Sequence, residues 1–110
     1  MNDLKSRHCI PCEGNVPPLT LEKAQAHLKS LDPRWKLTEE HKALEADFEF
    51  SNYFRTLAFV NAVAYIAIHE DHHPDLSFGY RNLHVRYSTH AIGGLSDNDF
   101  ICAAKVDALQ

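Results

Sequence analysis

The stretch ALEADFEFSNYFRTLAFVNAVAYIAIHEDHHP, residues 43–74, decides the fold of this chain. In its first part Leu44, Ala46, Phe48 and Phe50 are apolar, and an acidic residue stands between each pair of them. Strict alternation of this kind is typical of a strand with one buried face and one solvent-facing side. The stretch therefore begins with a half-buried strand.

The long apolar segment that follows has the period of a helix. Ser51 or Asn52 can cap its start, and we expect the helix to cover about residues 52–71. Its apolar arc is wider than packing on one sheet requires, so we expect a second packing partner, such as another subunit. The arc consists of Phe54, Leu57, Val60, Ala64 and Ile68, widened by Phe59, Val63, Ile66 and Ala67.

Three histidines, His69, His72 and His73, follow the apolar run directly before Pro74. Because a proline disfavours helical dihedrals at the preceding residue, the helix should end near Asp71 or His72, and the histidines then do not share one metal-binding face. Histidine titrates near neutral pH, so a corner stiffened by proline can present an acid and a base. Two alternatives stay open here: a metal site, and polar side chains that only end a helix.

The residues before this stretch predict a helix and a second strand. Thr20 is a plausible N-cap, and the helix should stop before Pro33. Trp35–Thr38 resembles a short strand, and the polar turn Glu39–Lys42 would join it to the strand 43–50 as a hairpin.

After Pro74 the pattern changes to short strands, at Leu76–Gly79 and Leu83–Thr89, with a turn at Arg81 and Asn82. His90 closes the second strand next to a glycine pair, which is a common place for a functional side chain. The last helix opens at Ser96–Asp99, where "SDND" forms a capping box.

The predicted order is helix, two strands, helix, two strands, helix. Short turns join the strands of each pair, so the pairs should be antiparallel. We therefore expect an α+β fold with a four-stranded antiparallel sheet and three helices packed on one face (α-β-β-α-β-β-α). Residues 20–110 form the single domain, and residues 1–19, with their prolines, form an irregular N-terminal arm.

Composition excludes several functions. The net charge of −4 comes without a clustered basic face, which argues against a nucleic-acid partner. No apolar run reaches the roughly 18 residues of a membrane span, and the first residues lack a signal peptide, so a cytoplasmic protein is expected.

The motif "HCIPC", His8–Cys12, is half of a zinc site, a redox pair, or part of the arm. No second CxxC completes a metal set.

Several motifs together resemble the pterin-4a-carbinolamine dehydratase family. They are "EDHHP" at Glu70–Pro74, "HVRYSTH" at His84–His90 and "GGLSDNDF" at Gly93–Phe100, with the strand-into-helix segment "FEFSNYFRTLAFVNAV" before them. A third histidine stands 18 residues after the first of the pair, and an aspartate nine residues further. The resemblance covers most of the chain from Leu21 onward, and the "CIPCEG" lead-in is similar to that of many bacterial and plant-type members.

The resemblance implies an activity. The family dehydrates 4a-hydroxytetrahydrobiopterin, the pterin-4a-carbinolamine left by an aromatic amino acid hydroxylase, to quinonoid dihydropterin, without metal or organic cofactor. His72, His73 and His90 match its active-site histidines, with His72 and His90 as the acid/base groups and His73 placing the pterin or sharing the proton transfer. The remaining matches are Asp71, Pro74, Ser88 and Thr89 around the substrate, and Asp99, which the capping box also explains.

The resemblance also implies partners. Family members form dimers or tetramers, and some animal members bind a transcription factor, so a non-catalytic assembly or coactivator-type module on the same fold is the alternative function. The chain departs from the family at Ile68, where many members carry an acidic residue, and at Leu76, where an aromatic residue is usual.

Overall fold

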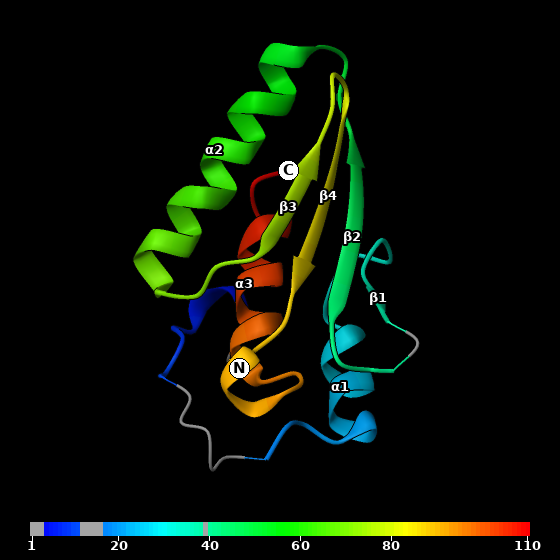
Figure 1. Ribbon diagram of the computed structural model, residues 1–110, viewed down its shortest axis with the longest axis vertical. Helices are drawn as coiled ribbons and strands as arrows, with labels where there is room; N and C mark the ends of the chain where they lie inside the picture. The colour runs from blue at the N-terminus through cyan, green and yellow to red at the C-terminus, as the bar shows by residue number, and fades with distance from the viewer. Residues whose placement is uncertain (1–3, 12–16, 39) are drawn as a thin grey trace.

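The computed structural model describes residues 4–11, 17–38 and 40–110, and in it three helices lie on one side of a four-stranded antiparallel sheet (Figure 1). The predicted α+β fold is confirmed. Its helices and strands are α1 (Leu21–Leu28), β1 (Lys36–Leu37), β2 (Leu44–Glu49), α2 (Tyr53–Glu70), β3 (Asp75–Phe78), β4 (Asn82–Tyr87) and α3 (Asp97–Asp107), with 3-10 turns η1 (Leu4–Ser6) and η2 (His90–Ile92).

The sheet has the order β1-β2-β4-β3, so β2 and β4, which α2 and β3 separate in the sequence, pair at its centre. Ala46 lies opposite Val85, and both are buried, whereas their neighbours Asp47 and His84 pair on the outer face. The alternation in the sequence therefore decides which side of the sheet receives the helices.

The core lies between the sheet and α3. Phe100 of α3 is fully buried and packs with the apolar face of β2 and β4 in one cluster. Trp35 closes the cluster from the side of β1, and its indole nitrogen donates to the Asp107 carboxylate at 2.8 Å. Burial of one such large side chain contributes about 1.5–3 kcal/mol, so this cluster fixes the position of α3 relative to the sheet.

Caps fix where the helices start. The Thr20 hydroxyl accepts from the backbone N–H of Lys23, and the Asn52 side chain accepts from the backbone N–H of Arg55, as the sequence predicts. Within the part of the chain that the structure describes, no helix is long and apolar enough to cross a membrane.

The two predicted hairpin turns lie between β1 and β2 and between β3 and β4. The hairpin turn between β3 and β4 lies at Gly79–Arg81, not at Arg81 and Asn82, because Asn82 already pairs with β2 and its carbonyl accepts from the N–H of Gly79. The predicted turn lies one to two residues too far along the chain. The turn starts at Gly79 because a side chain there would meet Oδ1 of Asn82 at 2.9 Å. The turn predicted at Glu39–Lys42 includes Glu39, which lies outside the described residues.

The described part of the N-terminal arm packs along α3. Leu4 is buried in the core, and Lys105 donates to the carbonyl of Lys5 at 2.8 Å. Arg7 pairs with Asp97 at the start of α3 at 3.3 Å. These contacts carry residues 8–11 toward the C-terminal end of α2.

Candidate active site

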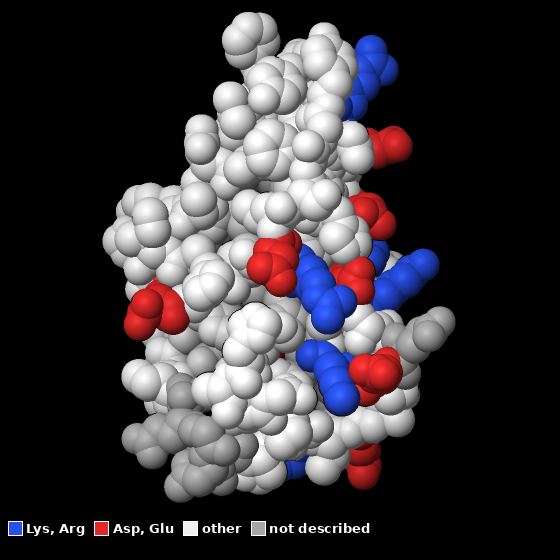
Figure 2. Space-filling model, in the orientation of Figure 1, with Lys and Arg blue, Asp and Glu red and all other residues white. Residues whose placement is uncertain are grey.

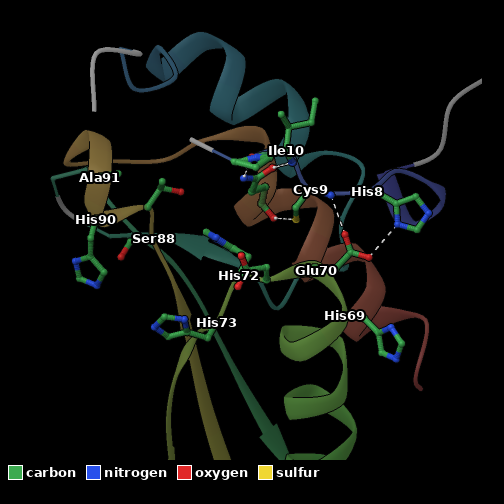
Figure 3. A pocket seen from close by; sticks show the side chains of 14 residues that line it. His8, Cys9, Ile10, His69, Glu70, His72, His73, Ser88, His90 and Ala91 are labelled. Carbon is green, nitrogen blue, oxygen red and sulfur yellow. Dashed lines mark hydrogen bonds and ion pairs between the residues drawn. The ribbon is translucent and has the colours of Figure 1, made fainter. Parts of the chain in front are cut away.

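A cavity of about 610 Å³ lies where the end of α2, the end of β4 and the N-terminal arm meet (Figure 3). Each of these three segments supplies one wall. The lining residues are His8, Cys9, Ile10, Pro11, His69, Glu70, Asp71, His72, His73, Ser88, Thr89, His90, Ala91 and Asn98.

The end of α2 explains how His72 and His73 reach the cavity. Asp71 adopts a left-handed conformation with φ 51°, and the N–H groups of Asp71 and His72 both point back to the carbonyl of Ala67. This is the usual way in which a helix stops, although glycine is the common residue there. The helix therefore ends at Glu70, close to the predicted position, and the left-handed turn acts three residues before Pro74.

His72 is held from two sides. Its Nε2 lies 2.6 Å from Oδ1 of Asp99, and its ring stacks on that of Tyr87 at 6.0 Å between centroids, with 8° between the planes. The His72 side chain is 12% exposed, and the Asp99 side chain is 0% exposed. A carboxylate accepts only, so Nε2 carries the hydrogen and Nδ1 is the nitrogen left to exchange a proton with a ligand.

Asp99 is the centre of a buried polar network. Its Oδ2 accepts from the hydroxyl of Thr89 at 2.9 Å and from the backbone N–H of Ser96 at 2.9 Å, while the hydroxyl of Ser96 lies 2.8 Å from that of Thr89. The contact with Ser96 is half of the predicted capping box. The cap alone is thus an incomplete account of Asp99, because the same carboxylate also holds His72 and Thr89.

His73 and His90 complete the histidine side of the cavity. Both side chains are exposed, and Figure 3 shows them on the same side of the cavity, with Ser88 near His90. His90 begins the turn η2 rather than ending β4, because β4 stops at Tyr87 and Thr89 pairs with Gly94. His69 stands apart from this group, beside Glu70, and its ring lies against Tyr65 at 4.2 Å.

The structure thus brings together most of the predicted site residues. His72, His73, His90, Asp71, Ser88 and Thr89 line the cavity, whereas Asp99 lies behind His72 and Pro74 is not among the lining residues. Within the described ranges, no group of His, Cys, Asp or Glu side chains has the arrangement of a metal site.

Sequence reasoning missed the wall that the arm supplies. Glu70, whose side chain is 6% exposed, accepts from the backbone N–H of Cys9 at 2.7 Å and lies 3.0 Å from the ring of His8. Asn98 of α3 exchanges two hydrogen bonds with the backbone of Ile10, at 2.7 and 3.0 Å. The motif "HCIPC" marked this segment, but no pattern pointed to Glu70 or Asn98 as its anchors; Cys12 lies outside the described residues.

Glu70 has a shifted acidity. Burial raises the pKa of its carboxyl, but the hydrogen bonds from Cys9 and His8 and the charge of Lys105 at 3.8 Å outweigh burial, so the pKa of Glu70 is lowered from its usual value. Glu70 is therefore an anion at neutral pH and an anchor for the arm.

These features define a class, a small α+β domain with a histidine-lined cavity at the end of its longest helix. The family model described as pterin 4 alpha carbinolamine dehydratase matches residues 17–109. The chain belongs to this family. The cavity wall formed by residues 8–11 lies before the matched range.

Curated relatives and solved structures agree with this assignment. A protein of Nitrosomonas eutropha named "Putative pterin-4-alpha-carbinolamine dehydratase" is 56% identical to this chain, over 97% of this chain and 93% of the relative. A protein of the same name in Legionella pneumophila is 48% identical, over 98% of this chain and 96% of the relative. A transcriptional coactivator/pterin dehydratase from Brucella melitensis has a TM-score of 0.79 at 27% identity, over 84% of this chain and 97% of that one. A pterin dehydratase-like RuBisCO assembly factor of the alpha-carboxysome has a TM-score of 0.60 at 28% identity, over 68% and 87%.

Proposed function

We propose that this protein dehydrates pterin-4a-carbinolamine, 4a-hydroxytetrahydrobiopterin, to quinonoid dihydropterin and water. The observation that carries the proposal is the pair His72–Asp99, 2.6 Å apart, at the wall of a cavity that His73 and His90 also line. Membership of the family supplies the substrate class.

The reaction needs one acid and one base. The C4a–O bond breaks as the hydroxyl accepts a proton and leaves as water, and the N5–H proton leaves as the C4a=N5 double bond forms. Neither step changes the oxidation state of the substrate. Imidazoles poised near neutral pH are suited to both transfers, which typically contribute about 10²–10⁴-fold each.

The geometry suggests how the roles divide. His72 acts as the base through Nδ1, because the Asp99 carboxylate at Nε2 stabilises the imidazolium that forms. His90 acts as the acid at the 4a-hydroxyl, and His73 orients the pterin. Asp71 and Ser88 bind polar edges of the ring, Thr89 acts through its bond to Asp99, and Pro74 shapes the corner from outside the cavity.

A direct assay of carbinolamine dehydration tests the proposal. The wild-type protein should accelerate the reaction above its uncatalysed rate, and His72→Ala and His90→Ala should each lower kcat/KM by roughly 10²-fold or more. His84→Ala is the matched control, because His84 lies on the outer face of the sheet between Glu45 and Asp47. Full activity in both site variants would contradict the proposed roles.

A second function, a non-catalytic assembly or coactivator-type module, has its own support. The two solved relatives carry the names of a coactivator and of an assembly factor. The outer face of α2 also exposes large apolar side chains, among them Phe54 and Ile68. This function predicts no acceleration of dehydration, together with a protein that co-purifies.

The proposed dehydration also implies partner proteins. An aromatic amino acid hydroxylase would supply the carbinolamine, so adding this protein to such a hydroxylase assay should raise the rate of sustained turnover. Self-assembly into a dimer or tetramer would cover the outer face of α2.

A further inference from the structure

Two cysteines that are far apart in the sequence meet beside the cavity. Sγ of Cys9 in the N-terminal arm lies 3.5 Å from Sγ of Cys102 in α3, and both are free thiols. The sequence motif had instead suggested Cys9 and Cys12 as a pair. Cys9 is half-buried and Cys102 is buried, so Cys9 is the thiol that a reagent meets first.

The backbone around Cys9 is fixed on both sides. The N–H of Cys9 donates to Oε1 of Glu70 at 2.7 Å, and the next residue, Ile10, exchanges two hydrogen bonds with Asn98. Cys102 is on the same helix as Asn98, one turn further along. A disulfide needs a sulfur–sulfur distance of about 2.05 Å, so closing the gap requires a movement of about 1.5 Å by the side chains rather than a refolding of the arm.

We propose that Cys9 and Cys102 form a reversible disulfide that fixes the N-terminal arm to α3. The bond would join the arm one turn after Asp99, which holds His72. In the oxidised protein a covalent bond would hold residues 8–11 at the wall of the cavity; in the reduced protein non-covalent contacts hold them, namely the hydrogen bonds with Glu70 and the packing of Cys9 against the core. The proposal is independent of the dehydration activity, since it concerns a bond and the mobility of a segment.

A small disulfide can serve as the oxidant that forms the bond between Cys9 and Cys102. The Cys9 thiolate attacks oxidised glutathione, forms a mixed disulfide and releases one glutathione thiolate. The Cys102 thiolate then attacks Sγ of Cys9, the protein disulfide forms, and a second glutathione leaves. The two protein thiols lose two electrons and two protons, which the two glutathione molecules receive.

The second step should be the slow one. The contact with Cys9 and the burial of Cys102 raise the pKa of the Cys102 thiol far above its usual value. Little Cys102 thiolate is therefore present at neutral pH, and thiolate is the attacking species. The mixed disulfide at Cys9 should accumulate first and then convert to the protein disulfide.

Peptide mapping in glutathione redox buffers tests the proposal. After oxidation and digestion with trypsin under non-reducing conditions, peptide 8–23 should be joined to peptide 87–105, and reduction should separate them. Cys12→Ser should give the same cross-link, which excludes Cys12 as the partner. A Cys9–Cys12 bond in the wild-type protein, or only glutathione on Cys9 of Cys12→Ser at equilibrium, would overturn it.

Hydrogen exchange tests the consequence for the arm. The amides of Cys9 and Ile10 should exchange roughly tenfold or more slowly in the oxidised protein than in the reduced one. In Cys102→Ala oxidation should leave these rates unchanged. If Cys102→Ala does not fold, Cys9→Ser takes its place in the peptide mapping, where the cross-link should be absent. Equal exchange in oxidised and reduced wild-type protein would show that the bond does not fix the arm.

Discussion

His72 and Asp99 join the end of α2 to the start of α3, with Nε2 of the histidine 2.6 Å from Oδ1 of the aspartate. His72 follows the left-handed turn after α2, whereas Asp99 lies in the first turn of α3 and caps that helix through Ser96. One carboxylate thus fixes a helix start and an imidazole together. The position of the histidine is therefore tied to the fold of α3.

Asp99→Asn separates these two tasks. Asparagine still accepts from the N–H of Ser96, so the cap should survive with a loss of about 1 kcal/mol or less. Its amide no longer stabilises an imidazolium on His72, so kcat should fall roughly 10- to 100-fold, and the acid limb of the pH profile of kcat/KM should change. Steady-state dehydration kinetics across pH measure this.

Thr20→Ala is the control for a loss of stability of similar size. It removes the hydroxyl that accepts from Lys23 at the start of α1, away from the cavity. It should cost about 1 kcal/mol of stability and leave the pH profile unchanged. If both variants lost activity in proportion to stability, Asp99 would be a structural residue only.

Tyr87→Phe should not destabilise the protein. Within the described residues the buried Tyr87 hydroxyl has no hydrogen-bond partner, and burial raises the pKa of its phenol well above its usual value. Removing an unpaired buried hydroxyl should leave the free energy of unfolding unchanged or raise it by up to about 1 kcal/mol. Urea denaturation measures this. A loss of more than about 1 kcal/mol would mean that the hydroxyl binds a buried water.

Glu70→Gln should weaken the arm in a pH-dependent way. The pKa of the Glu70 carboxyl is lower in the folded protein than its usual value, so its stabilisation is complete above the unfolded pKa of about 4.3 and is lost as pH falls through the folded value. The difference in unfolding free energy between wild type and variant should be about 1 kcal/mol at neutral pH. It should shrink below about pH 4.

Urea denaturation of both proteins across pH measures this difference. Glu22→Gln is the control, since Glu22 is exposed near the start of α1 and lines none of the cavity. A difference between wild type and Glu70→Gln that stays constant down to acid pH would contradict an anionic anchor.

The fold could be predicted because its signals are local. Alternation in β2, the helical period of α2 and the caps at Thr20 and Ser96 each depend on residues a few positions apart. The site could be predicted only in part. His72 and Asp99 are 27 residues apart, and Cys9 and Glu70 are 61 apart. Such contacts depend on how the elements pack, so the motifs name His72 and Asp99 separately but not the contact between them, and no short-range pattern connects the arm to α2.

The outer face of α2 leads to a prediction about assembly. Phe54 is 84% exposed and Ile68 is 78% exposed, with Tyr65 between them on the same helix. Figure 2 shows few charged side chains on the α2 side, whereas Lys, Arg, Asp and Glu gather over the strands. An exposed apolar stripe about 20 Å long, at 1.5 Å per residue, is typical of an interface.

The wild-type protein should therefore sediment as a dimer or tetramer at micromolar concentration, and the double variant Phe54→Glu, Ile68→Glu should shift it toward the monomer. Each of the two side chains contributes about 1.5–3 kcal/mol when it is fully buried, so their replacement by charges should weaken association by two orders of magnitude or more. Glu49→Lys is the control, because Glu49 is exposed at the end of β2 on the other side of the sheet. A wild-type protein that stays monomeric at high concentration would leave the α2 face to a different partner and favour the assembly function.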